Sequence, residues 1–283
     1  MTLLVFGRTG QLAQALAAQA QVTCLGRDRA DLSDPTACVA AIRVIKPRAV
    51  INAAAYTAVD RAEAEEAQAI VVNAETPGAM AQECARLGVP FVSVSTDYVF
   101  DGSGAAPWGP GDRPAPLNAY GRSKLAGERA VAGAGGAWAV IRTAWVFSGQ
   151  DGNFVTTLLA RARERERLAV VDDQIGGPTP ARALAAACLA VADQLAGDSG
   201  KAGLYHFAGT PEVSRAGFAR EIVAQAGLAC EIEDVPSSHY PAPARRPLNS
   251  RLDCTAFTAT FGLARPDWRQ DLRILLQERG EAA

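Results

Sequence analysis

The sequence has few of the residues that build metal sites and disulfide frameworks. Its 283 residues include two histidines, His206 and His239, which lie far apart. The six cysteines are scattered, and no two of them form a C-x-x-C pair. Zinc sites and disulfide frameworks need such residues at short, regular spacings. We therefore expect neither a disulfide framework nor a bound metal.

The sequence also lacks a large charge excess and a long apolar run. Lysine and arginine number 28 against 30 aspartates and glutamates, which gives a net charge of −2. A nucleic-acid-binding surface needs a basic tract, and none is present. No apolar run reaches the roughly 20 residues that span a membrane, and the first residues do not resemble a secretory signal. We expect a soluble cytoplasmic protein with no nucleic-acid or membrane partner.

Lysine is the third scarce residue. Only Lys46, Lys124 and Lys201 occur among the 28 basic residues. Lys124 follows Tyr120 by four residues in the segment Y-G-R-S-K, so on a helix the two side chains share one face. A nearby ammonium lowers the pKa of a phenol, and such a pair could deliver a proton near neutral pH. The alternative is a surface tyrosine and a solvated lysine, because this spacing arises easily by chance.

The first half of the chain alternates short apolar runs with helical patterns. The runs at residues 3–6, 22–25, 49–51, 90–95 and 138–142 predict strands. Helical patterns occupy residues 10–21, a segment opened by Ser33-Asp34-Pro35, residues 60–87, and the segment from 117 onward. Near-continuous apolar strands between helices indicate a parallel sheet covered on both faces. We predict an α/β protein whose residues 1–147 form a Rossmann-like, doubly wound dinucleotide-binding domain.

The second half has a looser pattern. Residues 153–167 and 181–196 are predicted helices, residues 172–180 a turn-rich loop, and residues 237–247 an extended loop. We predict that residues 148–283 form a smaller α/β lobe that binds substrate, with some segments returning to the first domain.

A glycine-containing turn follows the first predicted strand. In Gly7-Arg8-Thr9-Gly10-Gln11-Leu12-Ala13, glycine permits a tight turn, and backbone N–H groups at a helix start can bind a diphosphate. The two glycines form a shorter motif than the usual G-x-G-x-x-G, so a simple turn is the alternative. The position after a buried strand favours cofactor binding, and the candidate contacts are Gly7, Thr9, Gly10, Gln11 and Leu12.

Residues after the second and third strands point to the rest of the cofactor. Arg27 stands where NAD enzymes usually carry an acidic residue, which favours NADPH and leaves NADH possible. Asp31 and Leu32 could flank the adenine, although Asp31 could equally cap the next turn. Small residues after the third strand let a ligand approach the backbone or serve tight packing. This second group of candidates is Ala53, Ala54, Ala55, Tyr56 and Thr57.

The fourth strand ends in the hydroxyl-rich segment S-V-S-T-D-Y-V-F, residues 93–100. A hydroxyl from Thr96, the phenol of Tyr120 and the ammonium of Lys124 would together form a carbonyl-reduction site. The hydroxyl orients the substrate oxygen, the phenol gives the proton, and the ammonium tunes the phenol.

These motifs resemble the extended short-chain dehydrogenase/reductase family, and within it the dTDP-4-dehydrorhamnose reductases. The likeness continues through R-T-A-W-V-F at residues 142–147, D-Q-I-G-G-P-T at 173–179, G-L-Y-H at 203–206 and R-P-L-N-S-R-L at 246–252. The matching segments cover nearly the whole chain in order. The later ones are specific to the sugar-nucleotide branch.

The resemblance implies reduction of the 4-keto group of dTDP-4-dehydro-6-deoxy-L-mannose to dTDP-L-rhamnose by NADPH. Tyr120 would donate the proton, and Lys124 would lower the Tyr120 pKa and bind the nicotinamide ribose. The dTDP-sugar would contact Thr96, Asp97, Tyr98, Trp145, Asn153, Gln174 and Arg246. An ordinary core position for Trp145 and a surface charge for Arg246 are the alternatives.

Two departures and two alternative functions accompany this resemblance. Gly26 stands where some relatives have an acidic residue, which puts NADH use in doubt. Some relatives form dimers around magnesium, but Glu278 and Glu281 lie in an ordinary charged tail, so we expect no metal and either a monomer or a homodimer.

Another sugar-nucleotide ketoreductase or epimerase would share these motifs. A non-catalytic NADP-binding regulatory subunit would not need Thr96, Tyr120 and Lys124 together.

Overall fold

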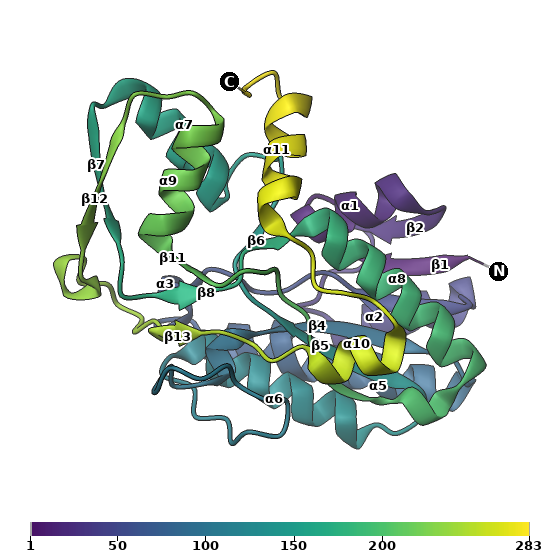
Figure 1. Cartoon of the computed structure of the whole chain (residues 1–283). Coiled ribbons are helices and arrows are strands. Elements are labelled where there is room, and N and C mark those ends of the chain that lie inside the picture. The colour runs from purple at the N-terminus through teal and green to yellow at the C-terminus, as the bar shows by residue number, and fades with distance from the viewer. Residues whose placement is uncertain (1, 283) are drawn as a thin grey trace.

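A six-stranded parallel sheet forms the centre of the protein in a computed structural model that describes residues 2–282 (Figure 1). The strand order is β10-β5-β4-β3-β1-β2. The strands are β1 (Leu3–Phe6), β2 (Val22–Leu25), β3 (Ala49–Asn52), β4 (Phe91–Thr96), β5 (Trp138–Thr143) and β10 (Gly203–His206). All five pairings are parallel, so the α/β, Rossmann-like prediction is confirmed.

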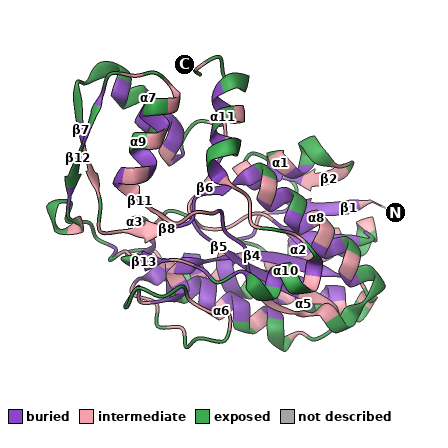
Figure 2. Cartoon of the chain, viewed as in Figure 1, coloured by how far each residue is buried: buried purple, intermediate pink, exposed green. Residues whose placement is uncertain are grey.

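Helices cover both faces of this sheet, and the strand sequences explain why. Leu3 and Val5 of β1 face a core made with helices α1 (Gln11–Gln19), α8 (Ala181–Gly197) and α10 (Thr255–Phe261). Leu4 and Phe6 face a second core made with α2 (Pro35–Ile45), α5 (Thr76–Leu87) and α6 (Ala119–Gly133). Successive side chains of a strand point to opposite faces, so β1 must be apolar throughout. Figure 2 shows β1 buried along its length.

The long helix predicted over residues 60–87 is interrupted. The structure has α3 (Val59–Ala62), α4 (Glu66–Ile70), a π-helical turn (Val71–Glu75) and then α5. Pro77 has no N–H to donate to the carbonyl of Asn73 four residues earlier, which disfavours regular α-helix there. The backbone of Gly127 in α6 packs against that same carbonyl, so close that a Cβ at Gly127 would overlap with it. The interruption lets α6 approach the turn closely.

A smaller lobe stands beside the sheet, at the upper left of Figure 1. It contains α7 (Phe154–Glu164), α9 (Arg215–Gln225) and α11 (Trp268–Glu278) around a core of its own, which includes Phe218 and Trp268. The parallel pair β7 (Arg167–Val171) and β12 (Glu231–Val235) completes it. The predicted helix over residues 153–167 ends earlier than expected, at Glu164. Residues 167–171 are extended because β12, from more than sixty residues later, pairs with them.

Short strands connect the lobe to the sheet. β8 (Ile175–Gly176) lies between β11 (Val213–Ser214) and β13 (Asn249–Ser250), and β6 (Val146–Phe147) pairs with β9 (Thr179–Pro180). Single 3₁₀ turns cover Asp97–Val99, Ser199–Lys201 and Ser237–His239. Strand β10 and helices α8 and α10 come from the second half yet pack with the central sheet. The division into domains at residue 147 stays a prediction, with these elements as the returning segments.

Candidate active site

The turn between β1 and α1 has the form that a diphosphate requires. Gly7 adopts a φ of 116°, which an L side chain rarely adopts. Gly10 is the N-cap of α1 and supplies no side-chain hydrogen bond, and the first turn of the helix carries no acidic residue. The N–H groups that begin α1 are therefore free of a capping side chain, and the helix dipole makes this end positive. These observations fit the binding of a dinucleotide.

Two arginines, Arg27 and Arg8, lie near the end of the second strand. Arg27 is exposed, as the cofactor prediction requires. Asp28 does not face Arg27 but forms an ion pair with Arg8, with an N–O distance of 3.1 Å. The Arg8 side chain lies over Gly26, where a Cβ would come within 3.1 Å of the guanidinium. The sequence analysis did not select Arg8, whose role becomes visible only when the phosphate turn and β2 lie side by side.

The side chain of Asp31 is used within its own turn. Its Oδ1 accepts the backbone N–H of Ser33 at 2.8 Å, so the capping alternative describes what the structure shows. Leu32 is buried, and its carbonyl accepts the hydroxyl of Thr76 at 2.6 Å. The proposed adenine contacts of Asp31 and Leu32 stay a prediction.

The segment after β3 is held by an asparagine that the sequence analysis did not select. Asn73, in the π-helical turn, accepts the backbone N–H of Tyr56 at 2.8 Å and donates to the Tyr56 carbonyl at 3.1 Å. It also donates to Ser123 of α6 at 2.9 Å. The Tyr56 phenol donates to Glu65 at 2.6 Å. Asn73 therefore fixes the small-residue segment, including Ala53, Ala54, Ala55 and Thr57, against the helix that carries Tyr120.

Helix α6 presents Tyr120 and Lys124 one turn apart. Asn118 caps the helix by accepting the N–H of Gly121 at 2.8 Å. A Cβ on Gly121 would overlap with the carbonyl oxygen of Tyr98, so this glycine lets α6 pack tightly against the turn after β4. Tyr120 is thereby brought to the carboxyl end of β4, with its ring in edge contact with Tyr98 at 5.7 Å between centroids.

Thr96 is the hydroxyl partner of Tyr120. It ends β4 and is buried close to the Tyr120 phenol, where its hydroxyl acts against the effect of burial on the Tyr120 pKa. Burial has the larger effect and raises the Tyr120 pKa well above its ordinary value, as do the nearby Asp97 and Tyr98. The structure thus brings Thr96 and Tyr120 together and keeps the phenol protonated, which suits a proton donor.

Lys124 has a different environment from the one expected. Its Nζ donates to the carbonyl of Val94 at 2.6 Å, and burial lowers its pKa to about 8, against the opposing charge of Glu128. Lys124 is not among the groups that shift the Tyr120 pKa, because the ammonium is directed to the sheet. This differs from the expectation that Lys124 lowers the Tyr120 pKa.

A buried ion pair supports this end of the site. Glu128, one turn after Lys124, accepts two hydrogen bonds from Arg142 of β5, at 2.8 and 2.6 Å. It also accepts the hydroxyl of Ser95 at 2.5 Å. Both charged side chains are under 5% exposed, so each needs the other to remain charged. The motif R-T-A-W-V-F therefore begins with a structural arginine, a role that the sequence analysis did not assign.

Asp97 and an unpredicted arginine lie next to Thr96. Asp97 is 3% exposed, and its Oδ1 accepts the Thr96 hydroxyl at 3.0 Å. Burial raises the Asp97 pKa to about 6, while Ser250, Thr96 and Arg215 act in the opposite direction. Arg215 begins α9, and burial lowers its pKa to about 10. Among residues 2–282 it forms no ion pair with a carboxylate.

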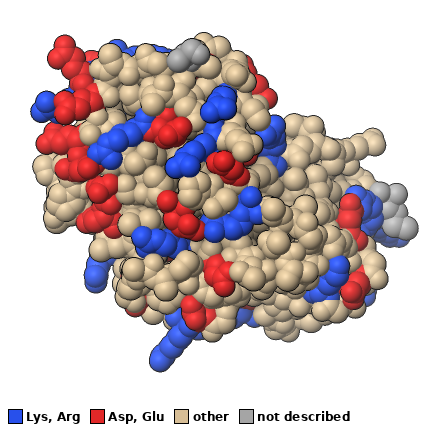
Figure 3. All heavy atoms as spheres, in the orientation of Figure 1, with Lys and Arg blue, Asp and Glu red and all other residues tan. Residues whose placement is uncertain are grey.

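A cavity of about 570 Å³ opens beside Tyr98. Arg161, Arg215 and Arg246 line it, together with Gln174 and residues of β7. Gln174 donates to Ser237 at 3.0 Å, which orients its amide. On the face shown in Figure 3, basic and acidic side chains alternate over the lobe. The three arginines make the cavity suited to an anionic ligand.

Arg246 is already paired. Its guanidinium forms two hydrogen bonds with Asp60 of α3, at 3.1 and 2.7 Å. Asp60 also accepts the backbone N–H of Ala244 at 3.2 Å, which fixes the loop that carries Arg246. The surface-charge alternative for Arg246 is thus too simple, since the side chain both lines the cavity and ties the loop to α3.

Trp145 and Asn153 have roles inside the protein. The ring of Trp145 stacks under the Arg215 guanidinium at 3.7 Å, and Trp145 has a φ of 52°, a strained conformation for a bulky residue. Asn153 caps α7, with its amide nitrogen donating to the Ser148 and Gln150 carbonyls and its oxygen accepting two backbone N–H groups. This cap uses every polar atom of the Asn153 side chain and leaves none for the substrate contact that we predicted.

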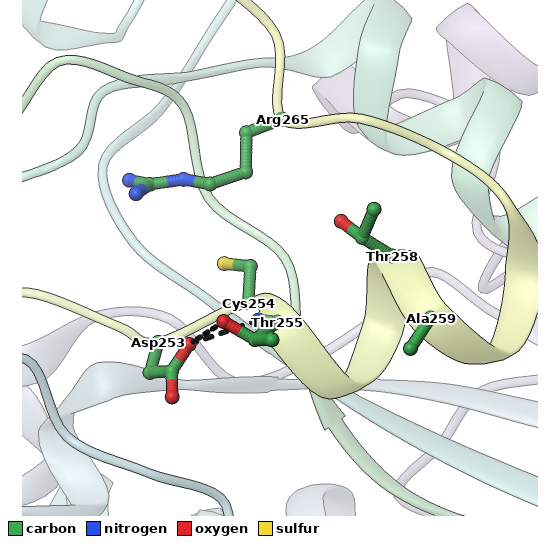
Figure 4. A pocket seen from close by; sticks show the side chains of 6 residues that line it. All are labelled: Asp253, Cys254, Thr255, Thr258, Ala259 and Arg265. Atoms are coloured by element: carbon green, nitrogen blue, oxygen red, sulfur yellow. Dashed lines mark hydrogen bonds between the residues drawn. The ribbon is translucent and has the colours of Figure 1, made fainter.

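A second hollow, of about 360 Å³, lies at the start of α10 (Figure 4). Three of its polar side chains already have partners: Thr255 donates to Asp253 at 2.6 Å, and Arg265 donates to the carbonyls of Ala208 and Gly209. None of the predicted site residues lines it. The candidate active site is therefore at the carboxyl ends of β1, β3 and β4, with the cavity of the lobe beside it.

The part of the chain that the structure describes has neither a metal-binding cluster nor a membrane-spanning helix. No group of three or more histidine, cysteine, aspartate or glutamate residues there is arranged to hold a metal ion. No helix within residues 2–282 is long and apolar enough to cross a membrane.

Comparison with known proteins identifies the family. Residues 1–280 match the family described as RmlD substrate binding domain. The chain is 44% identical over 295 residues to a dTDP-4-dehydrorhamnose reductase of Burkholderia thailandensis, covering 98% of this chain and 99% of the relative. The chain belongs to the dTDP-4-dehydrorhamnose reductase family. A reductase of the same name from Escherichia coli strain K12 is 39% identical, with 98% of each chain covered.

Solved structures of the reductase family have the same fold. A dTDP-4-dehydrorhamnose reductase of Clostridium acetobutylicum matches with a TM-score of 0.92 at 31% identity, over 99% of this chain and all of the other. The enzyme of Bacillus anthracis, solved in complex with NADP, matches with a TM-score of 0.90 at 30% identity, over 98% of this chain and all of the other. The predicted family and the oxidoreductase class are both confirmed.

Proposed function

We propose that this protein reduces the 4-keto group of dTDP-4-dehydro-6-deoxy-L-mannose with NADPH and forms dTDP-L-rhamnose. The observation that carries the proposal is the neighbouring pair Thr96 and Tyr120. It lies at the carboxyl end of β4, near the phosphate turn of β1 and beside a cavity lined by arginines. Relatives that bear the reductase name over their full length support it.

NADPH supplies the hydride when it is bound. The turn from Gly7 to Leu12 would hold the diphosphate with backbone N–H groups at the start of α1. Arg27 would contact the 2′-phosphate, with Arg8 close by over Gly26. The alanines after β3 would let the nicotinamide half approach the backbone. A relative solved with NADP supports this choice of cofactor, and NADH remains the second candidate.

Tyr120 would give its proton to the oxygen at C4. Its raised pKa keeps the proton in place until negative charge develops on that oxygen, and transfer then becomes favourable. Thr96 would orient both the phenol and the ketone. Lys124, held against Val94, would place its remaining N–H groups toward the cofactor ribose.

The lobe cavity would hold the nucleotide diphosphate. Arg215 and Arg246 each present a planar guanidinium, which matches phosphate oxygens, and Gln174 would contribute one polar contact. Arg215 replaces Asn153 in the set of substrate contacts that we propose. The absence of a metal requirement, a cytoplasmic location, and a monomeric or homodimeric state remain parts of this proposal.

The test is a coupled assay. The keto-sugar nucleotide is generated in situ by upstream enzymes, and NADPH oxidation is followed at its absorbance. We expect consumption of NADPH that depends on both the protein and the sugar nucleotide, with dTDP-L-rhamnose as the product on chromatography. No consumption at high protein concentration would exclude the reductase function, and a different product sugar would identify another ketoreductase or epimerase.

A further inference from the structure

One buried side chain joins the loop that carries Arg246 to the first turn of helix α6. Asn118 is 1% exposed, and its Nδ2 donates to the backbone carbonyl of Arg245 at 2.7 Å. Its Oδ1 accepts the N–H of Gly121 at 2.8 Å and so caps α6. Tyr120 belongs to the turn that this cap closes. Asn118 therefore contacts both the turn of the proposed proton donor and the loop of a cavity arginine.

The cap of α6 has a property that the helix alone does not require. Asparagine, aspartate and serine are about equally good caps, since the helix needs only an acceptor. Asp34 and Asp267 cap α2 and α11 with a carboxylate oxygen. At Asn118 the second partner is a carbonyl, which can only accept, so this cap must also donate. The bond to the loop explains why an amide stands at this position.

A second link holds the same loop from helix α3. Asp60 accepts the backbone N–H of Ala244 at 3.2 Å and two hydrogen bonds from the Arg246 guanidinium, at 3.1 and 2.7 Å. The loop after β4 also packs against this segment, because a Cβ on Gly102 would come within 2.6 Å of Pro247. Residues 244–246 are thus held on both sides at the edge of the cavity.

Helix α3 contacts the start of α6 as well. Glu63, the residue after α3, accepts the N–H of Ala119, the first residue of α6, at 2.7 Å. Hydrogen bonds therefore join α3, the first turn of α6 and residues 244–246 into a closed frame. Because Arg246 and Tyr120 both belong to this frame, the bonds of the frame set their separation.

We propose that Asn118 is a positioning residue for proton transfer, a role that rests on the reductase function proposed above. The diphosphate of the sugar nucleotide binds Arg246, and the keto-sugar extends from there to Tyr120. Asn118 fixes these two contacts relative to each other, so that a bound diphosphate places O4 beside the phenol. A loop without this link still binds the nucleotide but presents the sugar in several poses, which lowers kcat because the reacting groups are aligned less often.

Asn118→Asp keeps the cap and removes the link. A carboxylate accepts the Gly121 N–H but has no proton for the Arg245 carbonyl. At pH 8, in the full chain with NADPH, we expect kcat for the keto-sugar nucleotide to fall at least about fivefold. The Kd values for NADPH and for dTDP should stay within about threefold, because Asp60 still holds the loop. Asp34→Asn makes the reverse exchange at the cap of α2 and is the matched control with unchanged kcat.

Asn118→Ser separates the lost link from the added charge. Serine caps the helix without a charge, and its side chain is too short to hold Gly121 and Arg245 together. We expect the same fall of kcat as in Asn118→Asp. A fall in Asn118→Asp alone would be an effect of charge and would overturn the proposal, as would wild-type kcat in both variants or a change confined to KM.

Amide hydrogen exchange with dTDP as the probe tests the link without turnover. In the wild type, dTDP should slow exchange in peptides that cover residues 243–249 and also in those that cover residues 118–124. In Asn118→Asp the slowing should be confined to residues 243–249. Equal slowing of residues 118–124 in the variant and the wild type, or none in the wild type, would overturn the link.

Asp60→Asn supplies the test if the Asn118 variants do not fold. It weakens the second link to the loop and leaves the cap of α6 unchanged. It should also lower kcat, and a loss confined to KM would overturn the frame. In the double variant Asn118→Asp with Asp60→Asn, kcat should lie within about threefold of the worse single variant, since both release one loop. Multiplicative losses would contradict this. A wild-type protein without NADPH oxidation would instead overturn the reductase function itself.

Discussion

At the scale of residues, the environments of Tyr120 and Lys124 determine the pKa values of the two side chains. The sequence analysis predicted that Lys124 tunes the phenol. In the structure, burial raises the Tyr120 pKa and the Thr96 hydroxyl lowers it, while Lys124 itself is lowered to about 8 by burial. These pKa shifts depend on which side chains are buried away from water, and the spacing of residues in the sequence does not predict that burial.

Tyr120→Phe should abolish most turnover without disturbing the cofactor. The variant removes the proton donor and retains the ring that contacts Tyr98. General acid catalysis by a positioned group contributes roughly 10²–10⁴-fold, so we expect kcat to fall by at least about 100-fold. Stopped-flow measurement of NADPH oxidation and fluorescence titration of NADPH separate the two effects. Tyr205→Phe, which removes a partly buried hydrogen bond to the Lys201 carbonyl away from the site, should leave kcat unchanged.

Arg27→Ala should weaken NADPH binding and leave NADH binding nearly unchanged. A guanidinium that contacts the 2′-phosphate is worth a charge-assisted hydrogen bond, about 1.5–3 kcal/mol, which corresponds to roughly 10- to 100-fold in Kd. Calorimetric titration with each cofactor measures this directly, and NADH is the internal control. Equal weakening of both cofactors would remove Arg27 from the 2′-phosphate site.

At the scale of elements, helix α6 shows how close packing positions a reactive group. Gly121 lets the helix touch the turn after β4, and Gly127 lets it touch the π-helical turn that contains Asn73. The sequence showed both glycines within a helical pattern, where glycine usually weakens a helix. The folded structure explains both glycines, because each one allows a neighbouring backbone carbonyl to approach the helix closely.

Gly127→Ala should destabilise the protein much more than Gly133→Ala in the same helix. A Cβ at Gly127 would overlap with the Asn73 carbonyl, and overpacking of this kind costs about 1–3 kcal/mol in unfolding free energy. A Cβ at Gly133 meets nothing within 4 Å, so alanine there should be neutral or stabilising by up to about 1 kcal/mol. Urea unfolding of the two variants checks the difference. Equal stability of both would contradict the close approach.

The elements of the lobe were predicted less well than those of the sheet. The helix predicted over residues 153–167 ran into the first residue of β7, and the rest of β7 was not predicted, because its partner β12 lies far along the chain. Arg215 was not selected at all, since a single arginine before a helix has no motif around it. The structure gives it a role by stacking it on Trp145 and directing it to the cavity.

At the scale of the whole molecule, a buried network joins the sheet to the loop after β4. His206 of β10 accepts from Arg142 at 3.4 Å through Nε2 and donates from Nδ1 to the Trp108 carbonyl at 3.0 Å. Arginine can only donate and a carbonyl can only accept, so the neutral tautomer with the proton on Nδ1 satisfies both partners. Burial and Arg142 lower the His206 pKa to about 3.

This network predicts a pH dependence of stability. The folded His206 pKa lies below its unfolded value near 6.5, so its contribution is present above pH 6.5 and is lost as pH falls toward 3. Between pH 7 and pH 5 it should remove about 2 kcal/mol of unfolding free energy from the wild type. Denaturant titrations should show a shallower loss in His206→Gln and an unchanged slope in His239→Gln, whose side chain is exposed. Asp97 has a raised pKa, so its contribution to the free energy of unfolding grows as pH falls, opposite to that of His206. This contribution is the same in the wild type and in both variants.

The sequence by itself determined the α/β class, the parallel sheet, the phosphate turn and the placement of Thr96, Tyr120 and Lys124, because these follow from local periodicity and short motifs. Only the tertiary structure decided which groups share hydrogen bonds and which are desolvated. It hydrogen-bonded Thr96 to Asp97, paired Arg246 with Asp60, and used Asn153 as a helix cap. These relations depend on distances between elements that are remote in the chain, and burial sets their strength by removing water.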